Sequence, residues 1–150
     1  MFLVIARVST SLDAPAAAAW ETVKRLDTFR YVTRGVLGYR VAEGTPDDLR
    51  EGLVVRGRLL FFHVIPAWNH EIRVVRVDDE AREILTSESG GPVKNWGHTI
   101  RVETGQEPGR CRYTDEIDIR AGLLTPLVWA YAHIFYRYRQ ARWRRLARTL

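Results

Sequence analysis

The feature that most limits the possible folds is a run of strand-like segments over residues 53–122 with very short connections. The segments LVVRGRLLFFHVI, AWNHEIRVVRV, REILTSES, NWGHTIRVET and RCRYTDEIDIRAG are separated by Pro66 and by the turn signals DDEA, GGP and QEPG. Parallel strands need a crossover of about a dozen residues or more, so connections this short require antiparallel neighbours. The run therefore predicts an antiparallel meander.

The flanking segments predict the rest of an α+β domain. ARVSTSLDAP alternates like a strand, PAAAAWETVKRL has apolar residues at helical spacing, and Asp27 can cap a second short helix that Gly35 would end. VLGYRVAE is a further short strand. Thr125 and Pro126 provide a cap and a first-turn proline for a C-terminal helix of about 24 residues, roughly 36 Å long. Only this helix is large enough to cover the apolar face of such a sheet.

Composition indicates one globular domain over residues 1–150. The hydrophobic share of 46% and the charged share of 27% are globular values and argue against disorder. The single cysteine, Cys111, excludes an internal disulfide and a multi-thiolate metal site and favours a reducing, cytoplasmic location. The longest apolar stretch, residues 123–136, is shorter than the about 20 residues that span a bilayer. No transmembrane segment is expected, and the absence of a phosphate-binding glycine loop predicts no cofactor.

The net charge of +5 is concentrated at the C-terminal end. Residues 1–124 carry 17 Lys or Arg and 18 Asp or Glu, whereas residues 125–150 carry six arginines and no acidic residue. A basic element of this kind offers a partner- or polyanion-binding surface, but a basic stripe on a helix is usually only solvated.

The order of the elements, with DAPAAAAWETVKRLDTFRYV after the first strand, resembles the START-like or SRPBCC superfamily. This group includes birch-allergen-like proteins and polyketide cyclases/dehydrases, and APAAAAW is similar to its ApaevVW opening. The resemblance implies a helix-grip fold. In that fold a curved antiparallel sheet of about seven strands wraps around a long C-terminal helix, two short helices follow the first strand, and a hydrophobic cavity separates sheet and helix. Members include lipid carriers, hormone receptors, cyclases and hydrolase activators, so the resemblance does not select an activity.

Strand alternation predicts which side chains face that cavity. A turn at Pro66 and Ala67 would place His63 opposite His70, and a turn over residues 105–108 would place His98 opposite Asp115. The expected inner face therefore holds these aromatic and polar side chains: Phe61, His63, Trp68, His70, Trp96, His98, Tyr113 and Asp115.

The inward polar residues allow structural and chemical interpretations. The histidines can be satisfied by backbone carbonyls or water, and His98 with Asp115 is either a buried structural pair or a base oriented by a carboxylate. His63 and His70 supply only two ligands with no carboxylate beside them, so no metal site is predicted. Cys111 is expected to be a small core residue.

Apolar residues of the C-terminal helix fall on one face, and Arg137, Arg144 and Arg148 fall opposite. An interfacial membrane helix has the same pattern. Packing is nevertheless favoured, because removing the helix would expose the apolar face of the sheet. Nucleic-acid binding is not favoured, since the aromatic residues that stack on bases lie on the packed face. The predicted packed face comprises Val128, Trp129, Ala132, Phe135, Tyr136, Trp143, Leu146 and Leu150.

Arg139 is the exception, because it lies at the centre of this apolar arc. A buried guanidinium is costly without a partner. Its partner is either an acidic residue of the sheet or of the first helices, or the carboxylate or phenolate of a ligand held bidentately.

We predict a protein that binds a lipophilic small molecule between the sheet and the helix, for carriage or sensing, with Val128, Ala132, Phe135 and Arg139 contributing from the helix. The alternative is a cyclase/dehydrase-like lyase or isomerase, in which His98 oriented by Asp115 moves a proton and Tyr113 or Arg139 stabilises an enolate oxygen. The third alternative is a partner- or polyanion-binding module that uses the basic helix. Peripheral membrane contact remains open, and no oligomeric state is predicted.

Overall fold

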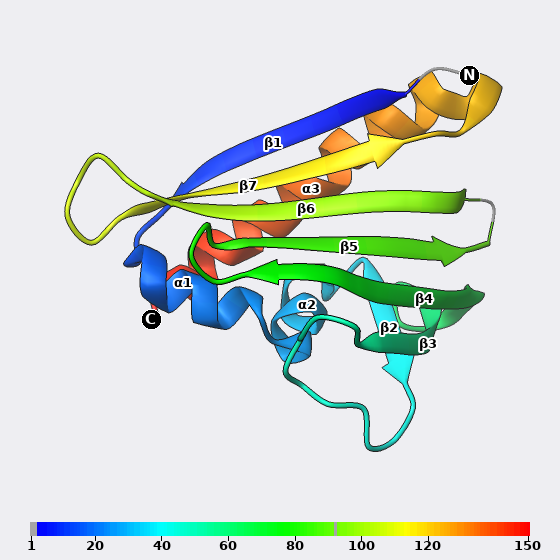
Figure 1. Ribbon diagram of the computed structural model, residues 1–150. Helices are drawn as coiled ribbons and strands as arrows, with labels where there is room; N and C mark the ends of the chain where they lie inside the picture. Colours follow the sequence, from blue (N-terminus) through cyan, green and yellow to red (C-terminus); the bar gives the residue numbers. More distant parts are fainter. Residues whose placement is uncertain (1–2, 92) are drawn as a thin grey trace.

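The computed structural model describes residues 3–91 and 93–150 and confirms an α+β helix-grip fold with one seven-stranded antiparallel sheet (Figure 1). The strand order is β1-β7-β6-β5-β4-β3-β2, so the first strand pairs with the last one. The elements in chain order are β1 (Val4–Leu12), α1 (Ala16–Val23), α2 (Leu26–Thr33), β2 (Leu37–Val41), β3 (Val54–Phe61), β4 (Ile65–Asp78), β5 (Glu83–Gly90), β6 (Val93–Thr104), β7 (Cys111–Ile119), a short 3₁₀ turn η1 (Gly122–Leu124) and α3 (Thr125–Ala147).

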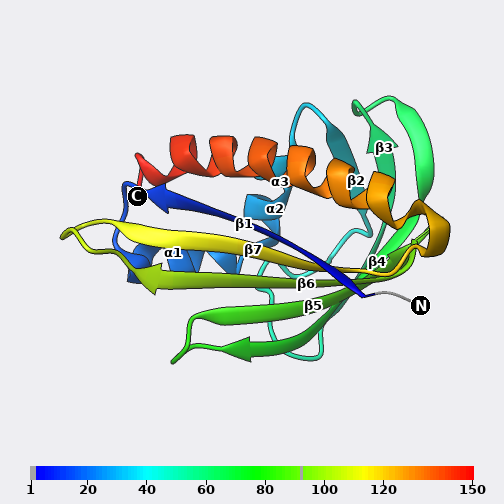
Figure 2. The ribbon, with the colours of Figure 1, turned by 90° about the horizontal axis from the view of Figure 1, so that it is seen from above.

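The long helix α3 runs along nearly the whole length of the sheet (Figure 2). It packs on β1, β7 and α2, while α2 also contacts β2 and α1 packs on β6 and β7. The helix buries Ala132, Phe135, Tyr136, Gln140, Trp143 and Ala147, together with Arg139. The predicted packing of the long helix on the sheet is therefore confirmed, but the apolar face is covered by all three helices and not by α3 alone, because α1 and α2 pack on strands that α3 does not cover by itself.

Two residues predicted on the packed face of α3 are instead exposed. Trp129 is 41% exposed and Leu150 is 44% exposed. Trp129 lies at the edge of the buried arc, about 80° from Arg139 at 100° per residue, where its ring packs edge-on against His133. The helix ends at Ala147, so its periodicity no longer applies to Leu150.

The turn between β3 and β4 corrects the predicted pairing of His63 with His70. The turn comprises residues 62–64, with positive φ angles at Phe62 and His63, and Gly57 lies opposite His70. Pro66 lies in β4 and not in the turn, and it pairs with Leu60. Proline is tolerated at the start of a strand, so its presence did not mark a turn. His63 is consequently exposed, and its Nε2 accepts a hydrogen bond of 2.9 Å from the backbone N–H of Gly35.

The register between β6 and β7 is displaced by two residues from the predicted one. The connection is longer than expected, so that Thr104 pairs with Cys111 and His98 lies opposite Ile117 rather than Asp115. A shift of two residues leaves every side chain on the same face. The predicted inward orientation of His98 and Asp115 is therefore confirmed, although the prediction that they lie directly opposite each other on the two strands was wrong.

Candidate functional site

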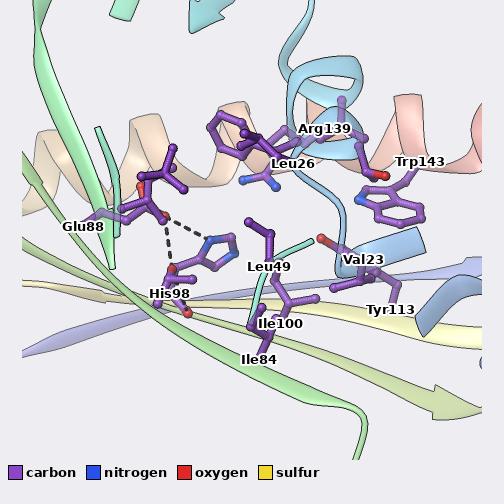
Figure 3. Close-up of a pocket in the computed structure, with 16 residues that line it drawn as sticks. Val23, Leu26, Leu49, Ile84, Glu88, His98, Ile100, Tyr113, Arg139 and Trp143 are labelled. Atoms are coloured by element: carbon purple, nitrogen blue, oxygen red, sulfur yellow. Dashed lines mark hydrogen bonds and ion pairs between the residues drawn. The ribbon is translucent and has the colours of Figure 1, made fainter. Parts of the chain in front are cut away.

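The site begins with a largely apolar pocket of about 420 Å³ between α2, α3 and strands β2 to β6. A smaller inner space of about 40 Å³ lies under α2 (Figure 3). Phe29, Glu88 and Arg139 line both spaces. The two spaces therefore meet at one apolar ring and two charged side chains. Seven predicted residues line the larger pocket: Phe61, Trp68, His70, Trp96, Val128, Phe135 and Arg139.

The other predicted site residues lie elsewhere. His98 and Tyr113 line the inner space, and Asp115 is buried behind them with no exposed surface. Ala132 packs in the core beneath α3 with Ala6 and the apolar residues of β7. His63 lies outside the larger pocket, beside α2 and Gly38.

Several pocket residues were not anticipated from the sequence, and Glu88 is the most important of them. Ile84, Thr86 and Glu88 are alternate residues of β5, and all three are buried. Strand alternation therefore contained the signal, since Glu88 shares the face of an evident core residue. The apolar residues that were also missed are Phe29, Leu37, Leu127 and Tyr131, whereas alternation had placed Leu59 on the inner face.

A chain of polar groups, joined by hydrogen bonds and by one longer ion-pair contact between His98 and Glu88, runs beneath the pocket. His98 Nε2 lies 2.8 Å from Asp115 Oδ1, and His98 Nδ1 lies 3.6 Å from Glu88 Oε1. On the pocket side, Glu88 Oε2 lies 3.0 Å from His70 Nε2. On the core side, Asp115 also accepts hydrogen bonds from Tyr113 and Gln140, each of 3.0 Å. Both carboxylates are thereby satisfied by neighbouring donors.

The protonation states of these polar side chains follow from their burial and their contacts. Burial alone would raise the pKa of Glu88, but the hydrogen bond from His70 and the nearby His98 lower it below its usual range. Burial would likewise raise the pKa of Asp115, but His98 and the field of Arg139 lower it. Burial would lower the pKa of His98, but its two flanking carboxylates raise it. The arrangement therefore favours a buried imidazolium between two carboxylates.

Arg139 projects from α3 into the junction of the two spaces and is 3% exposed. Figure 3 shows its guanidinium on the side facing His98 and Glu88. Within the described residues, no carboxylate lies within 4.0 Å of its nitrogens, and its Nε has no hydrogen-bond partner. The predicted direct ion pair with an acidic residue is therefore not formed.

Aromatic rings surround this guanidinium instead. Its central carbon lies 5.0 Å from the ring centre of Tyr136, 5.5 Å from that of Phe29 and 5.9 Å from that of Phe135. Contacts of this kind attract a cation to the ring faces but supply no hydrogen-bond acceptor in the plane of the guanidinium. Tyr136 is itself held, because its hydroxyl accepts a 3.1 Å hydrogen bond from Trp96 Nε1.

The exposed arginines of α3 form no comparable site. Arg137, Arg144 and Arg148 lie at the surface, as predicted, and Tyr136 and Trp143 are buried on the other face. Among residues 3–91 and 93–150, no helix is long and apolar enough to cross a membrane.

Comparison with known proteins supports the fold. A family model described as a domain of unknown function (DUF8410) matches residues 10–150. None of the curated proteins compared with the chain matches it in sequence.

Solved structures of several helix-grip proteins resemble the chain over almost its whole length. A START superfamily protein from Mycobacterium smegmatis has 11% identity and a TM-score of 0.72, covering 97% of each chain. Truncated norcoclaurine synthase from Thalictrum flavum has 13% identity and a TM-score of 0.68, covering 97% of this chain and 93% of its own. A major latex-like protein from Panax ginseng has 16% identity and a TM-score of 0.63, covering 94% and 97%. Identities this low show the shared fold alone.

Proposed function

Since this chain belongs to the DUF8410 family and has the START-like fold, we propose that it is a single ligand-binding domain that holds a lipophilic small molecule between the sheet and α3. The role is carriage or sensing and requires no chemical step. The site residues proposed from the larger pocket are Phe61, Trp68, His70, Trp96, Val128, Phe135 and Arg139.

The observation that carries this proposal is the pocket itself. Its volume of about 420 Å³ falls within the range of roughly 300–1,000 Å³ that is typical of small-molecule sites. Aromatic and aliphatic side chains form most of its wall, with a few polar groups at the inner end. An apolar cavity of this size favours burial of an apolar ligand over water, since each buried methylene contributes about 0.8 kcal/mol.

A direct test combines a neutral solvatochromic dye, such as Nile red, with native mass spectrometry of the purified protein. We expect a blue-shifted, saturable dye signal or a co-purifying lipophilic ligand. Val128→Trp should fill the pocket and weaken dye binding, whereas Ala130→Trp, on the exposed surface of the same helix, should leave it unchanged. If neither dye nor ligand binds, the proposed function is wrong.

The polar chain supports a second candidate function, a proton transfer of the cyclase/dehydrase kind. The row of polar side chains runs from Asp115 through His98 to Glu88, and Glu88 lines the larger pocket. The burial of His98, which is 3% exposed with both ring nitrogens engaged, argues against its direct contact with a substrate. For this reason we rank binding first.

Hydrogen–deuterium exchange next to the carbonyl of a bound ketone distinguishes the two functions. An enzyme of this kind should accelerate exchange in 2-acetylnaphthalene, and His98→Ala should abolish the acceleration without an equal loss of ketone binding. Exchange at the rate of buffer alone would remove the enzymatic candidate and leave the binding proposal intact.

The surface beside the pocket supports ligand uptake at a lipid membrane. Leu127, Tyr131 and Ile134 form an exposed stripe on α3 that continues from Leu123 and Leu124 in η1. Leu127 and Tyr131 also line the pocket, so the stripe reaches its rim. The helix carries no acidic residue, and Arg137 is exposed on it. This combination suits peripheral contact with anionic phospholipids.

A further inference from the structure

Unpartnered nitrogens gather in the residues that line the larger pocket. Among the described residues, four buried side-chain nitrogens lack a hydrogen-bond partner, namely Trp68 Nε1, His70 Nδ1, Arg139 Nε and Arg110 Nε, although Arg110 Nε lies 3.0 Å from Asp13 Oδ1 in an ion pair. Three of these four belong to pocket residues. Buried polar groups are normally paired, so such a concentration in one cavity needs a physical reason.

The unpartnered groups are mainly donors. The indole N–H of Trp68 can only donate, and the guanidinium of Arg139 carries five N–H donors and no acceptor. The nearest carboxylates do not serve them. Asp115 accepts hydrogen bonds from His98, Tyr113 and Gln140, and Glu88 is bonded to His70 and Thr86. Among the unpartnered groups of the pocket residues, the donors of Trp68 and Arg139 therefore outnumber the one nitrogen that can accept, His70 Nδ1.

The protein holds Arg139 in place without neutralising it by direct contact. The rings of Phe29, Phe135 and Tyr136 surround the guanidinium, and only 3% of the surface of Arg139 is exposed. Burial would lower the pKa of Arg139, but the field of Asp115 raises it, so the side chain stays cationic. A desolvated cation fixed in this way binds an anion far more strongly than an exposed one.

From this geometry we infer that Arg139 is the head-group receptor of the pocket and that the ligand is an amphipathic monoanion, with a carboxylate at the inner end and an apolar body toward the rim. This inference rests on the proposed function. A planar carboxylate matches the guanidinium bidentately. Glu88 lines the same pocket and disfavours a second negative charge, and Arg139 itself repels a cationic head group.

Matched probes test the head group and the body separately. The naphthalene series comprises 2-naphthoate, 2-naphthalenemethanol and 2-naphthylmethylammonium, and the alkyl series comprises decanoate, decanol and decylammonium. Binding is measured by isothermal titration calorimetry and by displacement of Nile red. We expect the carboxylate of at least one series to bind about tenfold or more tightly than its alcohol, which corresponds to one charge-assisted hydrogen bond, and the ammonium to bind most weakly.

Substitutions in α3 test whether Arg139 causes the preference for carboxylate probes. Arg139→Met should remove the preference for carboxylate and change alcohol binding by less than about twofold, whereas Arg139→Lys should retain part of it, because charge remains without the fork. Arg142→Met is the matched control. Arg142 lies on the same helix, but it stacks on Tyr31, at 4.5 Å, and donates to the Tyr31 carbonyl. This variant should keep the preference.

The outcomes separate this inference from the proposed function. If in both series the alcohol or the ammonium binds the wild-type protein as tightly as the carboxylate, Arg139 is no anion receptor, while the pocket still binds apolar molecules. If Arg139→Met keeps the preference, the inference is likewise overturned. If neither the dye nor any probe binds, the proposed function fails first. The comparison within the wild-type protein requires no variant to fold.

Discussion

At the residue scale, two buried groups determine the expected response of the protein to pH and to substitution. His98 lies between Glu88 and Asp115, with 3% of its surface exposed. Arg139, on the facing helix, has no carboxylate within ion-pair distance in the described part of the chain. The cluster around His98 therefore satisfies its own hydrogen bonds but keeps one net negative charge, which Arg139 offsets only through its field and without direct contact.

The charged states of His98, Glu88 and Asp115 predict that the free energy of unfolding has a maximum in mildly acidic solution. The pKa of His98 is raised above 6.5, so its contribution is complete below pH 6.5 and is lost as pH rises through the raised value. The pKa values of Glu88 and Asp115 are lowered from 4.5 and 3.8, so their contribution is present above those values and is lost in stronger acid. For this cluster, the free energy of unfolding should be highest between about pH 4.5 and 6.5.

Urea unfolding from pH 5 to 9 measures this effect in the wild type and in His98→Gln. The wild type should lose about 1.4 kcal/mol for each unit by which the pKa of His98 is raised. The variant should lack that alkaline decline, because it has no titrating ring. An equal decline in both proteins would show that another group is responsible.

Because Arg139 has no carboxylate at ion-pair distance within the described residues, its substitution should have an unusually small effect on the free energy of unfolding. In the ligand-free protein, Arg139→Met should change the free energy of unfolding by no more than about 1 kcal/mol in either direction, because the loss of a desolvated charge offsets the loss of its favourable field at Asp115. Thermal and urea unfolding of ligand-free protein measure the change. A loss of about 3–5 kcal/mol would instead identify a buried ion pair of structural importance.

At the element scale, α3 has one face that holds the sheet and another that meets solvent. Two tryptophans of this helix report on the two faces, since Trp143 is 1% exposed and Trp129 is 41% exposed. Trp143 packs against Tyr113, with 4.9 Å between the ring centres. The helix is attached to the sheet through both halves, by Ala132, Phe135 and Tyr136 in one and by Trp143 and Ala147 in the other.

Substitution of these two tryptophans tests the helix grip. Trp143→Ala should lower the free energy of unfolding by about 3–5 kcal/mol, the usual cost of a large cavity. Trp129→Ala, the matched control, should lower it by less than about 1 kcal/mol, as is typical of a surface site. Chemical denaturation measures both. Equal losses would contradict the assignment of faces.

At the scale of the whole molecule, the apolar stripe beside the pocket connects the ligand site with the surface. Leu123 is 101% exposed and Ile134 is 72% exposed, at the two ends of the stripe. Neither residue lines the pocket, so both can be changed without altering its wall.

Vesicle co-sedimentation tests the proposed membrane contact. The wild type should bind vesicles that contain phosphatidylserine, and a Leu123→Asp and Ile134→Asp double variant should bind at least about fivefold more weakly, because two apolar side chains are lost from the interface. Val75→Asp is the control, since Val75 is 45% exposed but lies outside the pocket and the stripe. Binding that is equal in all three proteins, or absent in the wild type, would contradict the contact.

The sequence by itself determined the elements and their inner faces. Alternation in β6 and β7 identified Trp96, His98, Tyr113 and Asp115 as inward, and helical spacing singled out Arg139. These patterns are local: a period of two or of 3.6 residues follows from backbone geometry and is readable wherever one face is buried.

Only the tertiary structure decided the pairings and the open space. A shift of two residues preserves the faces of a strand, so alternation did not reveal that His98 lies opposite Ile117, and a proline at the start of β4 was mistaken for the turn that contains His63. The pocket depends on how side chains from α2, α3 and five strands fill the volume between a curved sheet and a helix. That volume is a property of long-range packing, and it is what leaves Arg139 facing a cavity instead of a carboxylate.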